Sequence, residues 1–261
     1  MAEEHPLKPF YSVLVLAFAC SALVALAAVG LRPYQEANQA LDKKKNILAA
    51  AGIYEQGVDI EAQFASIETR LVDLDNGAFV QDTAIDPDTY DQLAASMQAD
   101  TGAELGKDED LAGIKRREKY SLVYLVKDGE KVDLLVLPVR GKGLWSTMYG
   151  YVALDADLST IRGVSFYEHG ETPGLGGEIE NPRWQQGWQD KKLYNDSGDL
   201  AVVVAKSGSQ RTPANEAYQI DGLSGATLTT QGVNDMMQFW FGEHGFEPFF
   251  EQIRTSGGFN G

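Results

Sequence analysis

The stretch SLVYLVKDGEKVDLLVLPV, residues 121–139, contains two runs of apolar and β-branched residues separated by a short polar segment. Such runs favour strands, and KDGE at 127–130 is typical of a tight hairpin turn. Two runs of the same kind follow, MYGYVALD at 148–155 and IRGVSFYE at 161–168. The four segments predict a mostly antiparallel sheet as the centre of the fold.

Helical and strand signals surround this predicted sheet. PRWQQGWQD at 182–190 and TTQGVNDMMQFWFGEHG at 229–245 predict helices, and LAVVVAK at 200–206 predicts a further buried strand. DPDTYDQ at 86–92 indicates a turn before a short helix. The fold class is therefore α+β, with helices flanking the sheet. The pattern leaves open whether the mixed, acidic segment 55–118 forms a separate lobe.

An apolar segment near the N-terminus, residues 10–31, contains no charged residue. As a helix rising about 1.5 Å per residue it would span about 33 Å, close to the roughly 30 Å of a bilayer core. It predicts a transmembrane helix, with a cleavable signal as the alternative because small residues lie near Ala25 to Ala28. A second helix is expected over 34–53.

The predicted organisation is therefore an N-terminal tail at 1–9, the membrane span at 10–31, a juxtamembrane helix and acidic segment at 32–118, and a soluble domain at 119–261.

Composition excludes several classes of function. The formal net charge of −16 repels a phosphate backbone, so we expect no nucleic-acid partner. The single cysteine and the three scattered histidines predict no metal site. The sequence shows neither a nucleophile elbow nor a dinucleotide-binding glycine fingerprint, which argues against a hydrolase or an NADH site.

The stretch DGLSGAT, residues 221–227, carries the strongest functional signal. Its two glycines allow the backbone to approach a ligand closely, and it opens a predicted helix whose N-terminus attracts anions such as phosphate. Hydroxyl groups follow at Thr227, Thr229 and Thr230. From the residues alone, an ordinary helix N-cap remains open as an alternative.

The pattern Asp-x-x-Ser-Gly-Ala-Thr resembles the flavinylation motif of FMN-binding domains. The resemblance implies that the Thr227 hydroxyl forms a phosphoester with FMN, attached by a flavin transferase that takes FMN from FAD and uses Mg²⁺. Asp221, Ser224, Gly225 and Ala226 are then expected to serve recognition and positioning. No residue of the chain is expected to be catalytic.

A second segment, EHGETPGLG at 168–176, resembles the loop that these domains wrap around the isoalloxazine ring. The resemblance implies contacts from Glu171, Thr172, Gly174, Leu175 and Gly176, with Leu175 covering a ring face. The alternative is a plain surface turn.

Two further residues are expected near the flavin. Trp145 is placed beside the ring by resemblance, or else is an aromatic residue at the rim of the core. Lys206 could stabilise the phosphate, with a solvated lysine as its alternative. His169 is not expected to act as a base, because electron transfer requires none.

Together, the apolar span and the flavin segments resemble the C subunits of sodium-translocating NADH:quinone oxidoreductases. The G subunits of Rnf electron-transport complexes are the nearest alternative, and a non-redox membrane-anchored scaffold is another. The resemblance implies an electron-relaying member of a six-subunit assembly in the bacterial inner membrane. NADH and ubiquinone would bind other members of that assembly.

The orientation in the membrane is a point of conflict. The resemblance implies one span and a periplasmic domain. Arg32 and the lysines at 43–45 follow the span and favour a cytoplasmic domain instead, although large domains often translocate against such a charge bias.

Overall fold

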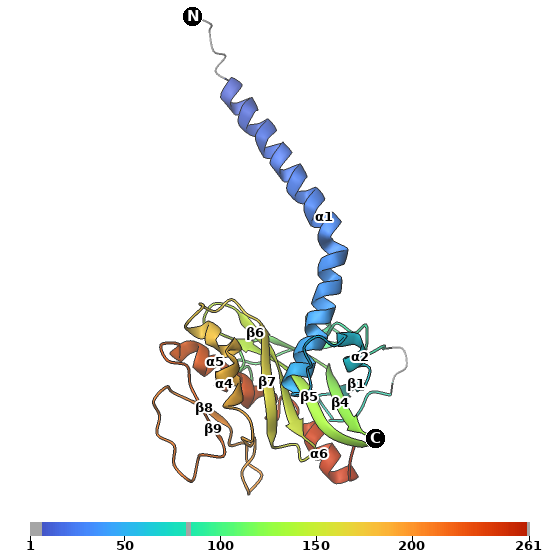
Figure 1. The fold of residues 1–261 in the computed structure, drawn as a ribbon, viewed down its shortest axis with the longest axis vertical. Coiled ribbons are helices and arrows are strands. Elements are labelled where there is room, and N and C mark those ends of the chain that lie inside the picture. The colour runs from blue at the N-terminus through green and yellow to red at the C-terminus, as the bar shows by residue number, and fades with distance from the viewer. Residues whose placement is uncertain (1–6, 82–84, 260–261) are drawn as a thin grey trace, which may run out of the picture. The chain divides into compact units, whose positions relative to one another are not determined.

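The computed structural model describes residues 7–81 and 85–259, so most of the expected N-terminal tail lies outside the described residues. The chain forms two compact units, Met1–Lys43 and Lys44–Gly261 (Figure 1). Helix α1, Lys8–Ala50, contributes to both.

The described part of the first unit is the N-terminal portion of α1. It is the one helix in the described ranges that is long and apolar enough to cross a membrane, with a mean hydropathy of 2.6 and none of that window buried. The expected span and the expected second helix form one continuous helix, with Pro33 in its interior. A single proline removes one backbone hydrogen bond, and the long helical stretches on both sides tolerate this loss.

The second unit is built on a five-stranded sheet in which every neighbouring pair of strands is antiparallel. Its order is β1 (Ile67–Asp73), β4 (Tyr120–Asp128), β5 (Lys131–Lys142), β6 (Thr147–Asp155) and β7 (Ile161–Glu168). The predicted antiparallel sheet is confirmed. Gly129 has the positive φ of 63° that a tight hairpin turn needs, and Asp128 pairs with Lys131 beside it.

Both faces of this sheet are buried, which explains why its strands are almost continuously apolar. In β5, Leu135 and Leu137 belong to one hydrophobic cluster, whereas Leu134 and Val136 belong to a second. Successive residues of a strand point to opposite faces, so the two clusters lie on opposite sides of the sheet.

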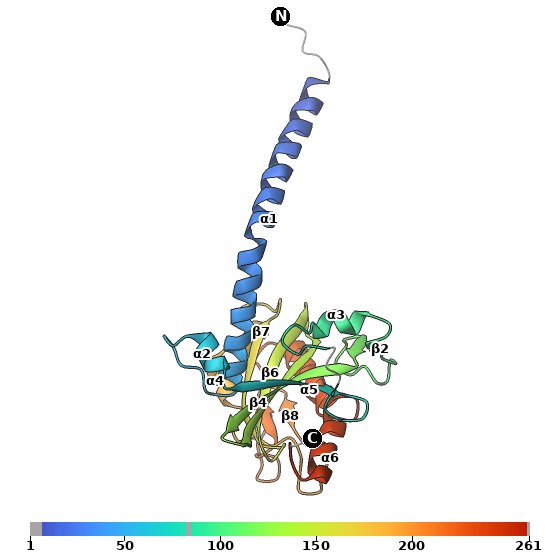
Figure 2. The same cartoon turned by 90° about the vertical axis from the view of Figure 1, so that its right-hand side faces the viewer.

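Helices cover the two faces (Figure 2). On one side lie α5 (Thr227–Trp240) and α6 (Glu247–Ser256), whose buried aromatic residues fill the first cluster. On the other, Ile47 and Leu48 from the end of α1 pack into the second cluster, with Phe64 of α2 (Ile60–Phe64) beside them.

Several short elements complete the fold. They are α3 (Gln92–Met97), β2 (Gly102–Glu104), β3 (Arg116–Glu118), the 3₁₀ helix η1 (Gly176–Glu180), α4 (Pro182–Gln186), β8 (Val203–Ala205) and β9 (Gln219–Asp221). The strand expected at 200–206 is shorter than predicted. It pairs in parallel with β9, outside the main sheet, and this pairing leads the chain directly into α5.

The acidic segment 55–118 is not a separate lobe. Its strand β1 pairs with β4 along seven residues, from Ile67–Val126 to Asp73–Tyr120. A boundary at 118/119 therefore does not separate two compact units. The pattern IETRLVD reads as polar because β1 is an edge strand with only part of its surface buried.

Candidate functional site

The DGLSGAT segment forms the turn between β9 and α5. Gly225 has a φ of +74°, in the left-handed region that glycine enters without strain. A Cβ atom there would lie 3.1 Å from Leu175 Cδ2, so the loop at 170–177 packs directly against the turn. The structure therefore brings the two sequence-predicted segments together.

Three threonines follow this turn, and their surroundings differ. Thr229 and Thr230 are 1% and 3% exposed, whereas Thr227 is exposed. Thr230 Oγ1 accepts a hydrogen bond from the Leu223 amide at 3.0 Å, and the Thr229 hydroxyl donates to Glu171 at 2.5 Å. Of the three hydroxyls, that of Thr227 is the one open to a reagent from solvent.

The N-terminus of α5 is suited to a phosphate. No side chain among the described residues caps it, whereas Asp59, Asp91 and Asn181 cap α2, α3 and α4. The N–H groups of a first helical turn have no partner within the helix, and the helix dipole adds about half a positive charge there. Thr227, as the first residue of α5, stands at this end.

Asp221 lies at the start of the motif and is held by two partners. Its carboxylate accepts from Arg211 Nε at 3.1 Å and Nη2 at 2.8 Å, and its carbonyl accepts from Trp184 Nε1 at 2.7 Å. These contacts position the chain that enters the turn. Arg211 was not predicted as a site residue. It lies in a loop ten residues before Asp221, and no sequence pattern indicates that the two side chains pair.

Glu171 connects the loop at 170–177 to two other segments. Its carboxylate is 4% exposed and accepts from the amides of Leu144 at 3.2 Å and Trp145 at 2.9 Å, and from the Thr229 hydroxyl. Burial favours a higher pKa, but the hydrogen bonds from Thr229 and from the amides at 144–146 outweigh it and lower the pKa of Glu171.

Large apolar side chains remain exposed around this site. Trp145 is 66% exposed, Leu175 is 44% exposed and Leu228, next to Thr227, is 58% exposed. Trp145 is thus not a core aromatic, and its exposed ring and the two leucines can contact a planar aromatic ligand.

The remaining predicted residues lie at the edges of the site. Thr172 and Gly174 are exposed, and the Thr172 carbonyl closes the loop by accepting from the amides of Leu175 at 3.1 Å and Gly177 at 2.9 Å. Lys206 is exposed, in a segment that packs on the motif: a Cβ on Gly222 would lie 2.1 Å from the Ala205 carbonyl oxygen.

Glycine is required at 176. A Cβ there would lie 2.5 Å from Thr229 Oγ1 and 2.9 Å from Glu171 Oε2. Ser224, an exposed residue, and Ala226, a buried one, complete the turn.

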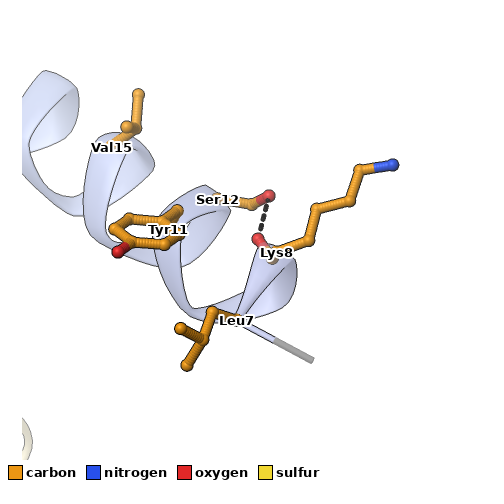
Figure 3. Close-up of a pocket in the computed structure, with 5 residues that line it drawn as sticks. All are labelled: Leu7, Lys8, Tyr11, Ser12 and Val15. Carbon is orange, nitrogen blue, oxygen red and sulfur yellow. Dashed lines mark hydrogen bonds between the residues drawn. The ribbon is translucent and has the colours of Figure 1, made fainter. Parts of the chain in front are cut away.

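One further hollow lies outside this site. A groove along the first turns of α1 is lined by Leu7, Lys8, Tyr11, Ser12 and Val15 (Figure 3). The Ser12 hydroxyl donates to the Lys8 carbonyl and the Tyr11 amide donates to the Leu7 carbonyl, so these contacts join residues one turn apart. The groove belongs to the apolar anchor. Within the described ranges, no group of histidine, cysteine, aspartate and glutamate side chains is arranged to hold a metal ion.

Comparisons with known proteins identify the family of this part of the chain. Residues 143–242, which contain all three segments of the site, match the FMN-binding domain family. The C subunit of the Na(+)-translocating NADH-quinone reductase of Pseudomonas aeruginosa is 46% identical over 97% of both chains. Its counterpart from Yersinia pestis is 44% identical over 97% of this chain and 95% of that one.

Solved structures give the same result. The crystal structure of Shewanella oneidensis NqrC matches with a TM-score of 0.76 at 37% identity, covering 84% of this chain and 99% of that one. The C subunit from Parabacteroides distasonis matches with a TM-score of 0.66 at 27% identity, covering 84% of this chain and 96% of that one. Because these relatives are 44–46% identical along nearly the whole chain, this membrane-anchored chain belongs to the family of Na(+)-translocating NADH-quinone reductase C subunits.

Proposed function

We propose that this chain carries FMN in a phosphoester bond to Thr227 and relays electrons as one subunit of a sodium-translocating NADH:quinone reductase. The observation that carries the proposal is the exposed Thr227 hydroxyl at the uncapped N-terminus of α5, inside a domain that matches the FMN-binding family. When bound, FMN supplies one-electron chemistry; the chain's own residues bind and orient it.

The attachment step is group transfer. A bond forms between Thr227 Oγ1 and the FMN phosphorus as the pyrophosphate bond of FAD breaks, AMP leaves and the hydroxyl releases its proton. An unaided threonine hydroxyl is a weak nucleophile, and the described residues place no base against Thr227, so a separate flavin transferase with Mg²⁺ performs this step. The exposure of Thr227 is compatible with access by a second protein.

Once attached, the phosphate would be stabilised by the first N–H groups of α5, by Ser224 in the same turn and by Lys206, which lies in the segment that packs on Gly222. Gly225 and Ala226 keep the turn compact, and Asp221 fixes its start. Trp145 and Leu175 pack against the ring, and Thr172 with the amides near Gly174 hydrogen-bonds its edge.

The other subunits of the complex supply the NADH and ubiquinone sites, in the six-subunit assembly that the family resemblance implies. Helix α1 anchors the chain in the lipid of the bacterial inner membrane as a single span, with the second unit in the periplasm.

Substitution of Thr227 tests the proposal. Protein from a host that contains the flavin transferase is denatured, separated by electrophoresis and examined for flavin fluorescence. The wild type retains fluorescence, Thr227→Ala loses it entirely, and Thr227→Ser retains part of it. Persistence of full fluorescence in Thr227→Ala contradicts the proposal and points to Thr229 or Thr230.

A further inference from the structure

The buried carboxylate of Glu171 is the place where the three segments of the site meet. It lies in the loop after β7, and it accepts hydrogen bonds from the loop between β5 and β6 and from the first turn of α5. Trp145, Leu175 and Thr227, one from each segment, are the residues expected to hold the two ends of the flavin. Their relative placement therefore depends on this one side chain.

Both carboxylate oxygens are already occupied. Oε1 accepts from the amides of Trp145 at 2.9 Å and Ser146 at 3.4 Å, and Oε2 accepts from the amide of Leu144 at 3.2 Å and the hydroxyl of Thr229 at 2.5 Å. With four donors on a side chain that is 4% exposed, Glu171 has no capacity left to contact a ligand.

The surrounding backbone is shaped to this carboxylate. A Cβ on Gly143 would lie 2.6 Å from Oε1, and a Cβ on Gly176 would lie 2.9 Å from Oε2. The amide of Glu171 itself donates to His169 Nδ1 at 3.1 Å, and His169 Nε2 lies 3.0 Å from a Glu180 carboxylate oxygen. The bond to His169 holds the backbone of Glu171 in the loop.

From these contacts we infer that Glu171 is a positioning residue, not a flavin ligand: it sets the position of the ring-contacting side chains relative to the attachment point and adds a fixed negative charge beside the flavin. This inference rests on the proposed function. Hydrogen bonds from neutral donors keep the carboxylate ionised in spite of its burial, in line with the direction of its pKa.

The charge has a predictable consequence. A fixed anion near a flavin opposes the addition of negative charge to it, and the low polarity of a buried site reduces screening. Replacing Glu171 with the neutral glutamine therefore raises the flavin's midpoint potential. Glutamine also places an N–H₂ group where one carboxylate oxygen now accepts hydrogen bonds. The backbone amides and the Thr229 hydroxyl that donate to that oxygen lose their acceptor, and the connection between the three segments is weakened.

The test compares full-length chains that carry flavin, purified in detergent from a host with the transferase. The variants are Glu171→Gln, Thr229→Val, the double variant and Glu168→Gln. Glu168 is an exposed carboxylate at the end of β7, three residues before Glu171, so its variant removes a nearby charge and leaves the four hydrogen bonds intact. The measurements are covalent flavin per chain, visible circular dichroism of the flavin and its midpoint potential.

Attachment persists in every variant, because Thr227 is unchanged. In Glu171→Gln the flavin dichroism falls at least twofold and the midpoint potential rises. Thr229→Val, which removes only the bond to α5, produces a smaller change in dichroism. The double variant shows no more change than Glu171→Gln alone, since both substitutions break one network. Glu168→Gln matches the wild type.

A flavin-loaded Glu171→Gln variant with the dichroism and potential of Glu168→Gln overturns the inference and leaves the proposed function standing. If thermal unfolding shows that Glu171→Gln does not fold, the Thr229→Val variant becomes the test. Unchanged flavin dichroism in Thr229→Val would then overturn the inference about Glu171. A wild-type chain without covalent flavin refutes the proposed function, and this inference with it.

Discussion

Thr227, Thr229 and Thr230 occupy one helical turn and have the same chemistry, yet the fold gives them different surroundings. Thr229 and Thr230 lie on the face of α5 that continues through Val233, Met236 and Met237, all buried. Residues three and four apart share one helix face, but Thr227 and Thr230 are themselves three apart, so helical spacing alone does not separate the three threonines. Burial in the fold makes the difference, because it leaves Thr227 exposed and covers Thr229 and Thr230.

The role of Glu171 shows what the sequence could not supply. The loop motif placed it among flavin-contacting residues, and nothing in the motif indicates that its partners are backbone amides 25 to 27 residues earlier and a threonine 58 residues later. Contacts between distant segments depend on how the strands pair. A sequence pattern describes only local geometry.

The buried ion pair between Glu118 and Arg140 gives a prediction about stability. Glu118 is fully buried, and its carboxylate lies 2.6 Å from Arg140 Nη2. Arg140→Leu leaves this carboxylate without a counter-charge, so we expect the free energy of unfolding to fall by roughly 3–5 kcal/mol. Chemical denaturation of the purified chain measures it.

The control removes an arginine from an exposed pair, Arg162 and Asp155, whose nitrogen and oxygen lie 2.9 Å apart. Arg162→Leu should cost about 0–1 kcal/mol. An equal fall in the free energy of unfolding for the two substitutions would show that the buried pair stabilises the fold no more than the exposed pair does.

At the scale of elements, strands were predicted better than helices and short segments. The four apolar strands were confirmed to within three residues at each end, because strands that are buried on both faces are almost continuously apolar. Edge strand β1 was missed because its polar positions resemble a loop. Helix α6 was missed because Gly245 and Pro248 interrupt the pattern, although proline is well accommodated in a first helical turn.

Three tyrosines on β4, β6 and β7, whose rings lie close together, give a prediction about alkaline pH. The rings of Tyr124 and Tyr151 lie 6.0 Å apart, and those of Tyr151 and Tyr167 lie 5.1 Å apart. Burial is the main cause that raises the pKa of all three hydroxyls, that of Tyr167 to about 12. The fold thus favours their neutral forms.

A pKa that folding raises contributes stability fully below the unfolded value, near pH 10 for tyrosine, and this stability is lost as the pH rises through the folded value. We therefore expect unfolding to become easier above about pH 10, with the three buried tyrosines ionising only as the fold opens. Ultraviolet absorbance of tyrosinate, followed alongside circular dichroism, measures both. Complete ionisation near pH 10 with the fold intact would refute this expectation.

On the scale of the whole molecule, the apolar helix and the acidic second unit bear on membrane orientation. Positive charges that follow the span, at Arg32 and at lysines 43–45, favour a cytoplasmic second unit, whereas we propose a periplasmic one. A reporter enzyme that folds only in the periplasm, fused after Gly261, should be active. Activity of a cytoplasm-specific reporter at the same position, with the periplasmic reporter silent, would reverse the orientation.

Assignment to the family and its fold was accessible from the sequence, because short motifs and one long apolar segment carry that information. The chain aligns with a C subunit along 97% of its length, and its fold matches a solved structure of the family over 84% of the chain. The contacts between distant segments were not accessible in this way, because they depend on long-range packing. The bonds of Glu171 to Thr229 and of Arg211 to Asp221 are examples.

The most direct measurement of the central claim is mass spectrometry of the tryptic peptide 212–254, prepared from the chain as made in its native host. This peptide contains Thr227, Thr229 and Thr230 and no internal lysine or arginine. We predict that it carries the added mass of FMN and that fragmentation places this mass on Thr227. A peptide of unmodified mass, or a modification at Thr229 or Thr230, would contradict the account.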